Sequence, residues 1–231
     1  MTVTNEVSHR FVPLDYVERS PDQMTARAAE FYALMRRRRT VRDFSSRPIP
    51  DGVIEHALLT AGSAPSGAHR QPWHFVAVTD PAKKAAIREA AEKEERAFYG
   101  KRASTEWLEA LEPLGTDPDK PFLTTAPVLI AVFLRRFTFV PGAVGEPTRR
   151  LKNYYTAESV GIATGLLIAA LHNAGLATLT HTPSPMGFLN DLLGRGRDER
   201  AYVLVVAGFP APDAVVPDLE RFALDDLATF V

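Results

Sequence analysis

The chain has 231 residues, a formal net charge of −1 and a hydrophobic fraction of 45%. A chain of this length can bury one substantial core, and its near-zero net charge excludes a bulk attraction to nucleic acid or to an anionic membrane surface. It contains no cysteine, which excludes disulfides, thiolate metal sites, iron–sulfur clusters and a cysteine nucleophile.

No segment of the sequence has the pattern of a targeting or membrane-spanning element. The first 20 residues are mixed polar and acidic, without the apolar core of a signal peptide. The longest apolar stretch, residues 160–171, is too short to span a bilayer and contains Thr164 and two glycines. We therefore expect a cytoplasmic protein that does not bind membranes.

The N-terminal segment predicts an extended arm followed by two helices. Residues 1–22 show little helical periodicity and form the predicted arm. An apolar stripe with basic residues at its C-terminal end predicts a helix from Gln23 to about Arg38. A second helix is predicted from about Asp51 to Ala61, with Asp51 within reach of the N-cap position and Gly62 closing the helix.

A loop at Pro65–Ala68 separates these helices from a strand and a third helix. The run Phe75–Val78 predicts the strand. A highly charged helix is predicted to start at Pro81 and to end near Tyr99. Residues 100–120 are ambiguous, with one helical piece at Thr105–Leu111 and then a turn-rich stretch.

The C-terminal half contains a buried strand, a long helix and two further strands. The strand is predicted at Val128–Leu134, and residues 135–150 are predicted to be a loop. The helix, from about Tyr155 to Ala174, is rich in small residues, which fits core packing or a dimer seam. The last strands and the tail are predicted at Leu176–Thr180, Tyr202–Ala207 and Pro210–Val231.

This order of elements predicts a mixed α/β or α+β architecture. No Gly-x-Gly-x-x-Gly follows a strand and no phosphate-binding P-loop is present, so the signature of a doubly wound nucleotide-binding fold is missing. His69 and His74 have no carboxylate spaced for a catalytic triad or a metal. We therefore expect no metal site.

Two segments have the chemistry of anion binding. Residues 36–42 contain five arginines, and arginine binds phosphate in a bidentate manner, although such runs also occur on solvated surfaces. In the loop that includes Ser66, Gly67 and Ala68, small residues allow backbone N–H groups to approach an oxyanion closely. The alternative there is a tight structural turn.

Two further segments carry polar side chains in suggestive places. Glu95 and Tyr99 are four residues apart and would share one face of a helix, as surface pairs commonly do. Thr180, His181 and Thr182 fall at the end of a predicted strand. Hydroxyl groups there are plausible cofactor contacts, but threonine is also a good strand former, and His181 fits a simple strand-end role.

Together these segments resemble the nitroreductase superfamily, and within it the iodotyrosine deiodinases, from about Tyr32 to the C-terminus. The sequence segments on which the resemblance rests are Arg38–Arg42, Thr60–His69, Ala126–Ile130, Leu171–Leu176 and Val216–Leu219. The resemblance implies an α+β fold with a central, mostly antiparallel sheet flanked by helices. It also implies an intertwined homodimer of one nitroreductase-like domain per chain, with FMN at the subunit interface and residues 210–231 extending onto the partner subunit.

By the same resemblance, the FMN phosphate is held by Arg38, Arg39 and Thr40, joined by Arg221. Arg42 is expected near the N1/C2 carbonyl edge of the flavin, where a cation stabilises the reduced ring. The remaining expected flavin contacts are Pro65, Ser66, Thr180, His181 and Thr182. The Thr182 hydroxyl is expected to bond flavin N5 and to act in catalysis, whereas the family shows threonines where this chain has His181.

The resemblance implies substrate contacts from two segments: a lid of about residues 95–120 and the loop that contains Gly67 and Ala68. Glu95, Tyr99 and Lys120 are expected to grip the zwitterion of a halotyrosine, while Gly67 and Ala68 hold its phenolate through backbone N–H groups. The implied reaction is FMN-dependent reductive dehalogenation, with NAD(P)H (NADPH or NADH) or a separate reductase as the electron source.

The sequence leaves three alternatives to reductive dehalogenation open. The same FMN site could serve a general nitroreductase or quinone reductase, in which the lid is generic. It could serve the flavin-fragmenting branch of the superfamily, in which the Glu/Tyr/Lys clamp would have no role. A flavin-binding module without enzymatic activity is the last alternative.

Overall fold

The computed structural model describes residues 11–142 and 146–231, and these fall into two units that divide after Arg37. The first unit contains a single helix, α1 (Pro21–Met35), preceded by extended chain. The arm was predicted to run to residue 22, but the helix already begins at Pro21, two residues earlier than predicted. Residues 1–10 of the predicted arm lie outside the described part of the chain. The helix begins early because Ser20 and Gln23 form a capping box, with Ser20 Oγ accepting from the Gln23 N–H at 3.3 Å.

The second unit is built on a four-stranded antiparallel sheet with the order β1-β2-β6-β5. Its strands are β1 (Trp73–Val78), β2 (Val128–Arg135), β5 (Ala177–His181) and β6 (Glu199–Gly208). The two central strands, β2 and β6, are almost entirely buried, which is why they read in the sequence as continuous apolar runs. The observed fold is therefore the predicted α+β class.

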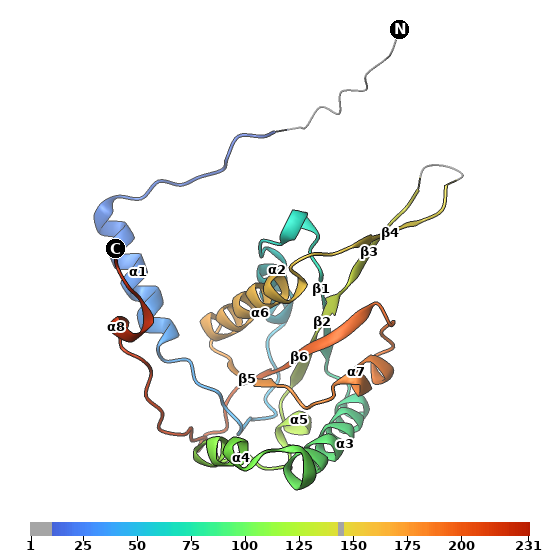
Figure 1. The fold of residues 1–231 in the computed structure, drawn as a ribbon. Coiled ribbons are helices and arrows are strands. Elements are labelled where there is room, and N and C mark those ends of the chain that lie inside the picture. The colour runs from blue at the N-terminus through green and yellow to red at the C-terminus, as the bar shows by residue number, and fades with distance from the viewer. Residues whose placement is uncertain (1–10, 143–145) are drawn as a thin grey trace. The chain divides into compact units, whose positions relative to one another are not determined.

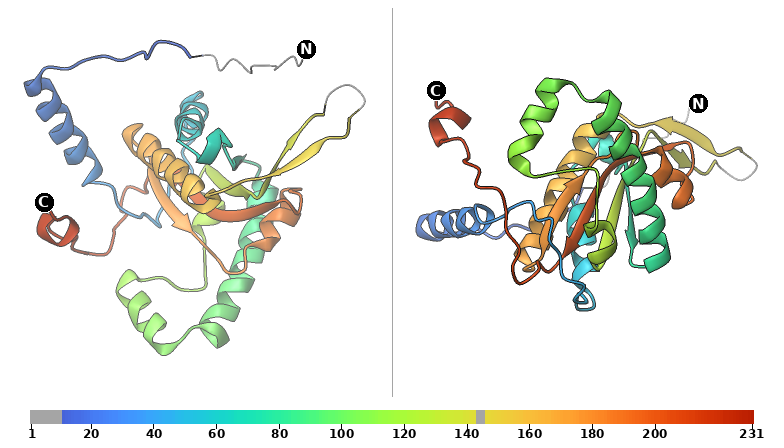
Figure 2. Two further views of the ribbon diagram at one scale, coloured as in Figure 1. Left: turned by 45° about the horizontal axis from the view of Figure 1, so that its top comes forward. Right: turned by 90° about the horizontal axis from the view of Figure 1, so that it is seen from below.

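Helices cover both faces of this sheet (Figures 1 and 2). Alternate residues of β2 point to opposite faces, so that Leu129, Ala131 and Phe133 join one core cluster while Ile130 and Val132 join the other. The first cluster is completed by α3 (Pro81–Ala97), α5 (Phe122–Thr125) and α7 (Gly187–Leu192). The second is completed by α2 (Val53–Gly62) and α6 (Thr156–Asn173).

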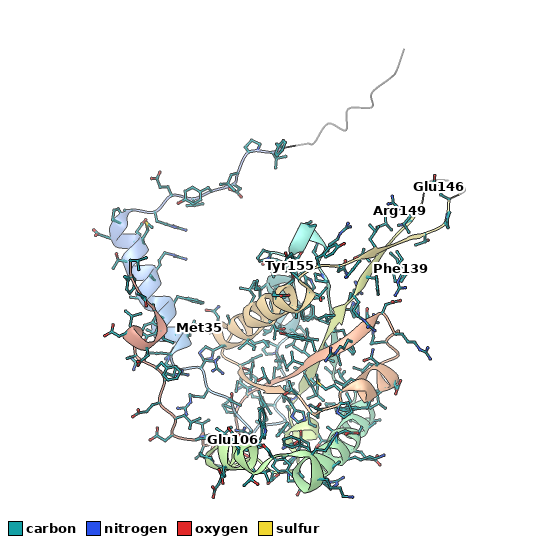
Figure 3. The ribbon with its side chains drawn as sticks, viewed as in Figure 1. Met35, Glu106, Phe139, Glu146, Arg149 and Tyr155 are labelled. Atoms are coloured by element: carbon teal, nitrogen blue, oxygen red, sulfur yellow. The ribbon has the colours of Figure 1, made fainter. Side chains whose placement is uncertain are left out.

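Two predictions about local structure were wrong. Residues 135–150 are not simply a loop, because β3 (Phe137–Val140) pairs with β4 (Arg149–Lys152) as a hairpin; Figure 3 shows Phe139 and Arg149 on its two strands. Asp51 is not the N-cap of α2. The cap is Gly52, whose φ of +82° lies in the left-handed region that glycine adopts without strain.

The helical path from α3 to α5 is more broken than the sequence predicts. After α3 the chain makes one π-helical turn (Phe98–Arg102), then α4 (Thr105–Leu111) and a short 3₁₀ turn (Glu112–Leu114). The prediction of α4 was correct to the residue. Its start is fixed by Ser104, whose hydroxyl accepts from the Trp107 N–H at 3.3 Å.

Residues 40–45 run along the β5 edge of the sheet and position the first arginines. Thr40 forms a parallel bridge with Thr178, and the Val41 N–H donates to the Thr178 carbonyl at 3.2 Å. Phe44 bridges to Pro210 just after β6. In the described residues no helix is long and apolar enough to cross a membrane.

The C-terminal tail turns back onto its own chain before it ends. The Ala211 N–H donates to the Asp43 carbonyl at 2.9 Å, and Arg221 Nη2 donates to the Arg38 carbonyl at 2.6 Å. Both contacts lie within one chain, and the predicted extension onto a partner subunit stays a prediction for residues 210–221 as well. The remaining residues, including α8 (Leu224–Leu227), are exposed, and their contact with a partner stays a prediction.

Candidate active site

A cavity of about 270 Å³ lies between the C-terminal end of β5 and the helical segment that follows α3. Its lining contains most of the polar residues that the sequence singled out. These are Arg42, Glu95, Tyr99, Lys120, Thr180, His181 and Thr182. The apolar part of the lining comes from residues that the sequence did not mark, including Phe98, Trp107, Leu111 and Phe122.

Lys120 and Glu95 form a nearly buried ion pair in this cavity. The Lys120 Nζ lies 3.4 Å from Glu95 Oε2, and the two side chains are 3% and 13% exposed. The ammonium also donates to Thr116 Oγ1 at 3.2 Å and to the Asp117 carbonyl. A buried ion pair of this kind gains little stability, because desolvation offsets much of its Coulomb energy. It presents one cation and one anion side by side to whatever occupies the cavity.

Tyr99 completes this group from the π-helical turn. Its hydroxyl donates to the Thr116 carbonyl at 3.1 Å, and its ring centroid lies 5.7 Å from Lys120 Nζ. Because π-helical turns are frequent at functional sites, the π-helical turn after α3 itself indicates a functional site. The three residues that the sequence predicted as a clamp are therefore brought together. Thr116, which lies between them, had no sequence signal beyond its position in a turn-rich stretch.

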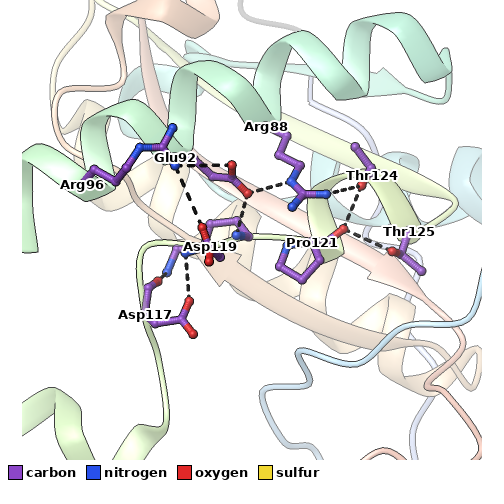
Figure 4. Close-up of polar contacts among 9 residues, drawn as sticks. Arg88, Glu92, Arg96, Asp117, Asp119, Pro121, Thr124 and Thr125 are labelled. Carbon is purple, nitrogen blue, oxygen red and sulfur yellow. Dashed lines mark hydrogen bonds and ion pairs between the residues drawn. The ribbon is translucent and has the colours of Figure 1, made fainter.

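The backbone of Lys120 is held by an ionic network on α3 (Figure 4). The Lys120 N–H donates to Glu92 Oε1 at 2.8 Å, and Glu92 pairs with Arg88 at 2.6 Å and with Arg96 at 3.7 Å. Burial raises the pKa of Glu92, but the hydrogen bonds from Lys120 and Arg88 outweigh it and leave that pKa below its usual value. Glu92 thus stays ionised and fixes the position of Lys120 relative to α3.

A second cavity, of about 250 Å³, adjoins the first through Arg42, which lines both. Its other basic residues are Arg38, Arg39 and Arg221. Burial first, then repulsion from Arg221 and Arg39, lowers the pKa of Arg38. A cluster of cations that repel one another is stabilised by a bound dianion such as a phosphate.

Two contacts with the tail build this arginine corner. Arg39 Nη2 donates to the Pro217 carbonyl, and Arg221 donates to the Arg38 carbonyl as described above. Thr40 lies in the same lining. The structure therefore brings together all four residues predicted to hold a phosphate, from segments about 180 positions apart in the sequence.

The loop Pro65–Ala68 is not part of this arrangement. In the described chain none of its residues lines either cavity, because the loop leads into β1, and β1 and β5 are the opposite edges of the sheet. With a spacing of roughly 4.8 Å between neighbouring strands, the two edges are separated by about 14 Å. A single chain therefore divides the predicted site residues into two groups.

The loop itself has an unusual backbone. Ala68, His69 and Gln71 have positive φ values of 50°, 52° and 47°, a conformation that is costly for residues with a Cβ and is concentrated at functional sites. Gly67 lies against Tyr154 and Tyr155, and a Cβ on Gly67 would be 3.1 Å from the Tyr154 carbonyl oxygen. Figure 3 shows Tyr155 at the start of α6.

Comparison with known proteins identifies the family and two close relatives. The model of the nitroreductase family matches residues 35–209. The chain is 54% identical to the iodotyrosine deiodinase of Haliscomenobacter hydrossis, over 91% of this chain and 93% of the relative. It is 44% identical to iodotyrosine deiodinase 1 of Mus musculus, over 98% of this chain and 78% of the relative.

A solved structure agrees with these relatives. Oxidised iodotyrosine deiodinase bound to FMN and 3-iodo-L-tyrosine superposes with a TM-score of 0.71 and 30% identity, covering 87% of this chain and all of that chain. The segments that match include the two adjoining cavities, since residues 35–209 contain every lining residue of the first and the arginines of the second except Arg221.

Proposed function

Because the chain belongs to the nitroreductase family, in its iodotyrosine deiodinase branch, we propose that it removes halogen reductively from halotyrosines with FMN as its cofactor. One observation supports this more than any other: the nearly buried Glu95–Lys120 pair, with Tyr99 beside it, adjoins a phosphate-binding corner. A simple nitroaromatic compound has neither an ammonium nor a carboxylate group for such a pair to bind. An amino-acid zwitterion has both.

The residues present fit FMN. The corner of Arg38, Arg39, Thr40 and Arg221 would hold the phosphate, and the mutual repulsion of its guanidinium groups favours a doubly charged anion. Arg42 and the strand-end hydroxyls of Thr180 and Thr182 would hold the edge of the ring system. When bound and reduced, FMN would supply the two electrons of the reaction.

The protein side of the reaction is binding, orientation and exclusion of water. Glu95 would accept hydrogen bonds from the substrate ammonium, and Lys120 and Tyr99 would bind its carboxylate. Closing the segment of residues 95–120 over the ligand strengthens each of these contacts by excluding water. Two electrons and one proton then replace the carbon–halogen bond with a carbon–hydrogen bond, releasing halide and tyrosine.

The electrons come from outside the chain. We propose NAD(P)H, or a reductase that draws on it, as the source, and therefore a cytoplasmic enzyme. The structure of the clamp does not depend on which of these reductants acts.

The reaction is tested by halide release. Dithionite-reduced holoenzyme is expected to release one iodide and one tyrosine from each 3-iodotyrosine, and to do so faster than it reduces a nitroaromatic compound such as nitrofurazone. The measurement is iodide by a selective electrode and tyrosine by chromatography. A preparation that reduces nitrofurazone readily and releases no iodide would identify a general nitroreductase instead.

We further propose that the site is completed by a second copy of the chain. The loop Pro65–Ala68 lies at the far sheet edge from the clamp, so it can contribute its backbone N–H groups only to a site on another chain. In a two-fold dimer each loop would then serve the cavity of its partner. The exposed apolar residues Leu59 and Ile162, on α2 and α6, fit such an interface.

This arrangement predicts complementation between two inactive variants. Glu95→Lys damages the clamp, and Ala68→Pro removes the loop N–H and cannot adopt the observed φ of 50°. In a purified hybrid dimer one site carries both defects and the other carries none, so that about half of the wild-type iodide release is expected. Two different affinity tags allow the hybrid to be isolated.

The matched control is Ala68→Gly, which keeps the N–H and suits the positive φ. It is expected to be active without a partner. An inactive hybrid, formed from variants with native circular dichroism, would mean that loop and clamp act in the same chain.

A further inference from the structure

His181 lines the cavity, and its Nε2 is a buried polar atom that the proposed reaction has not used. His181 is the last residue of β5, and its side chain is 7% exposed. In the described part of the chain no hydrogen-bond partner is recorded for its Nε2. A buried polar nitrogen without a partner is costly, and a hydrogen bond to a bound ligand would offset that cost.

The alternation of β5 points His181 to the opposite side of the sheet from Thr180, one of the residues proposed to hold the flavin. Neighbouring residues of a strand face opposite sides of the sheet, and Thr180 is exposed where Leu179 and His181 are buried. His181 therefore points with Leu179 toward α5, and its ring packs edge-on against Phe122, with centroids 5.6 Å apart and planes at 83°. Phe122 follows Lys120 by two residues, and the imidazole and the clamp residues line the same cavity.

The electrostatic surroundings keep this imidazole neutral. Burial, followed by repulsion from Lys120 and Arg42, lowers the pKa of His181 to about 3. The ionisable groups that line the cavity with it are Arg42, Glu95, Tyr99 and Lys120. At neutral pH one ring nitrogen is then a hydrogen-bond donor without charge, placed where two cations attract an anion.

We propose that His181 Nε2 is a substrate-binding group that donates a hydrogen bond to the carboxylate of the bound amino acid, alongside Lys120. The inference rests on the proposed function and adds to it a contact from the sheet, opposite the clamp on the lid. It gives the site a second means of selecting an amino-acid head group over a simple phenol. It also assigns the Nε2–H tautomer to the bound state.

The test compares three variants of the FMN-loaded protein. His181→Phe keeps a ring beside Phe122 and removes the nitrogen. His181→Gln places an amide nitrogen close to the position of Nε2, whereas the shorter His181→Asn places one close to Nδ1. Binding of 3-iodotyrosine and of 2-iodophenol, which has no head group, is measured by calorimetry and by the change in flavin absorbance.

For His181→Phe and His181→Asn we expect iodotyrosine binding to weaken by a factor of ten or more, while iodophenol binding changes less than threefold. His181→Gln should recover most of the iodotyrosine affinity. The reduction potential of the bound flavin should stay at its wild-type value in all three variants. If His181 instead supported the fold or contacted the flavin, replacing it would be expected to shift this potential.

Three results would overturn the proposal. Unchanged iodotyrosine binding in His181→Phe would show that Nε2 contacts only a water molecule. Equal losses for iodotyrosine and iodophenol, or a shifted flavin potential, would place the contact on the cofactor or the fold. These results are distinguishable from a failure of the proposed function, in which the wild-type protein itself would not bind iodotyrosine.

Discussion

Replacing Glu95 with glutamine is expected to weaken the binding of 3-iodotyrosine at least tenfold. Glu95 presents an almost buried carboxylate beside Lys120, and its proposed partner is the substrate ammonium. A hydrogen bond to a charged group is worth about 1.5–3 kcal/mol, which corresponds to a factor of roughly 10 to 150 in a dissociation constant. The glutamine amide keeps the shape but loses the charge.

The measurement is the dissociation constant of iodotyrosine for oxidised holoenzyme, followed by iodide release under single-turnover conditions. Glu94→Gln is the matched control. Its carboxylate is one residue away on the same helix but is paired with Arg102 at 2.9 Å, outside the cavity lining. It should bind iodotyrosine as the wild type does.

A second ligand separates the clamp from the rest of the site. 2-Iodophenol lacks the ammonium and the carboxylate, so its binding should be the same in Glu95→Gln and in the wild type. Full activity of Glu95→Gln toward iodotyrosine would remove the zwitterion clamp from the proposed mechanism and leave the FMN site intact.

The second large effect is expected at the arginine corner, where Arg38→Ala should weaken FMN binding at least tenfold. The side chain of Arg38 lies among like charges, while its carbonyl accepts the hydrogen bond from Arg221. Alanine therefore removes one cation that is proposed to bind the phosphate, without removing the backbone contact with Arg221. The loss of a charge-assisted bond to phosphate is worth about 1.5–3 kcal/mol.

Riboflavin is the discriminating ligand because it has the same ring without the phosphate. Titration of apoprotein, followed by quenching of flavin fluorescence, should show a weaker affinity of Arg38→Ala for FMN and an unchanged affinity for riboflavin. Arg37→Ala is the control, since Arg37 is exposed and is not among the lining residues of the corner. Equal losses for FMN and riboflavin would mean that Arg38 supports the fold rather than the phosphate.

Local signals in the sequence were sufficient for most helices. Ser104 fixed the start of α4, and Pro81 fixed the start of α3, because capping and proline preferences act within a few residues. The same kind of signal, the capping box of Ser20, was available for α1 and would have corrected its start. The hairpin of β3 and β4 had no such signal. Its pairing joins Phe137 to Lys152, which are 15 positions apart in the sequence, and a strand without clear alternation is ambiguous from sequence.

By itself the sequence determined the family of this protein and predicted its site residues from the arginine run, the glycine-containing loop and the Glu95/Tyr99 spacing, because short motifs depend only on neighbouring positions. Only the tertiary structure decided which of these residues meet. It paired Lys120 with Glu95, brought Arg221 to Arg38 and buried His181 in the lining of the same cavity. It also placed the loop Pro65–Ala68 at the other sheet edge, because the order of strands in a sheet is set by contacts between segments far apart in the chain.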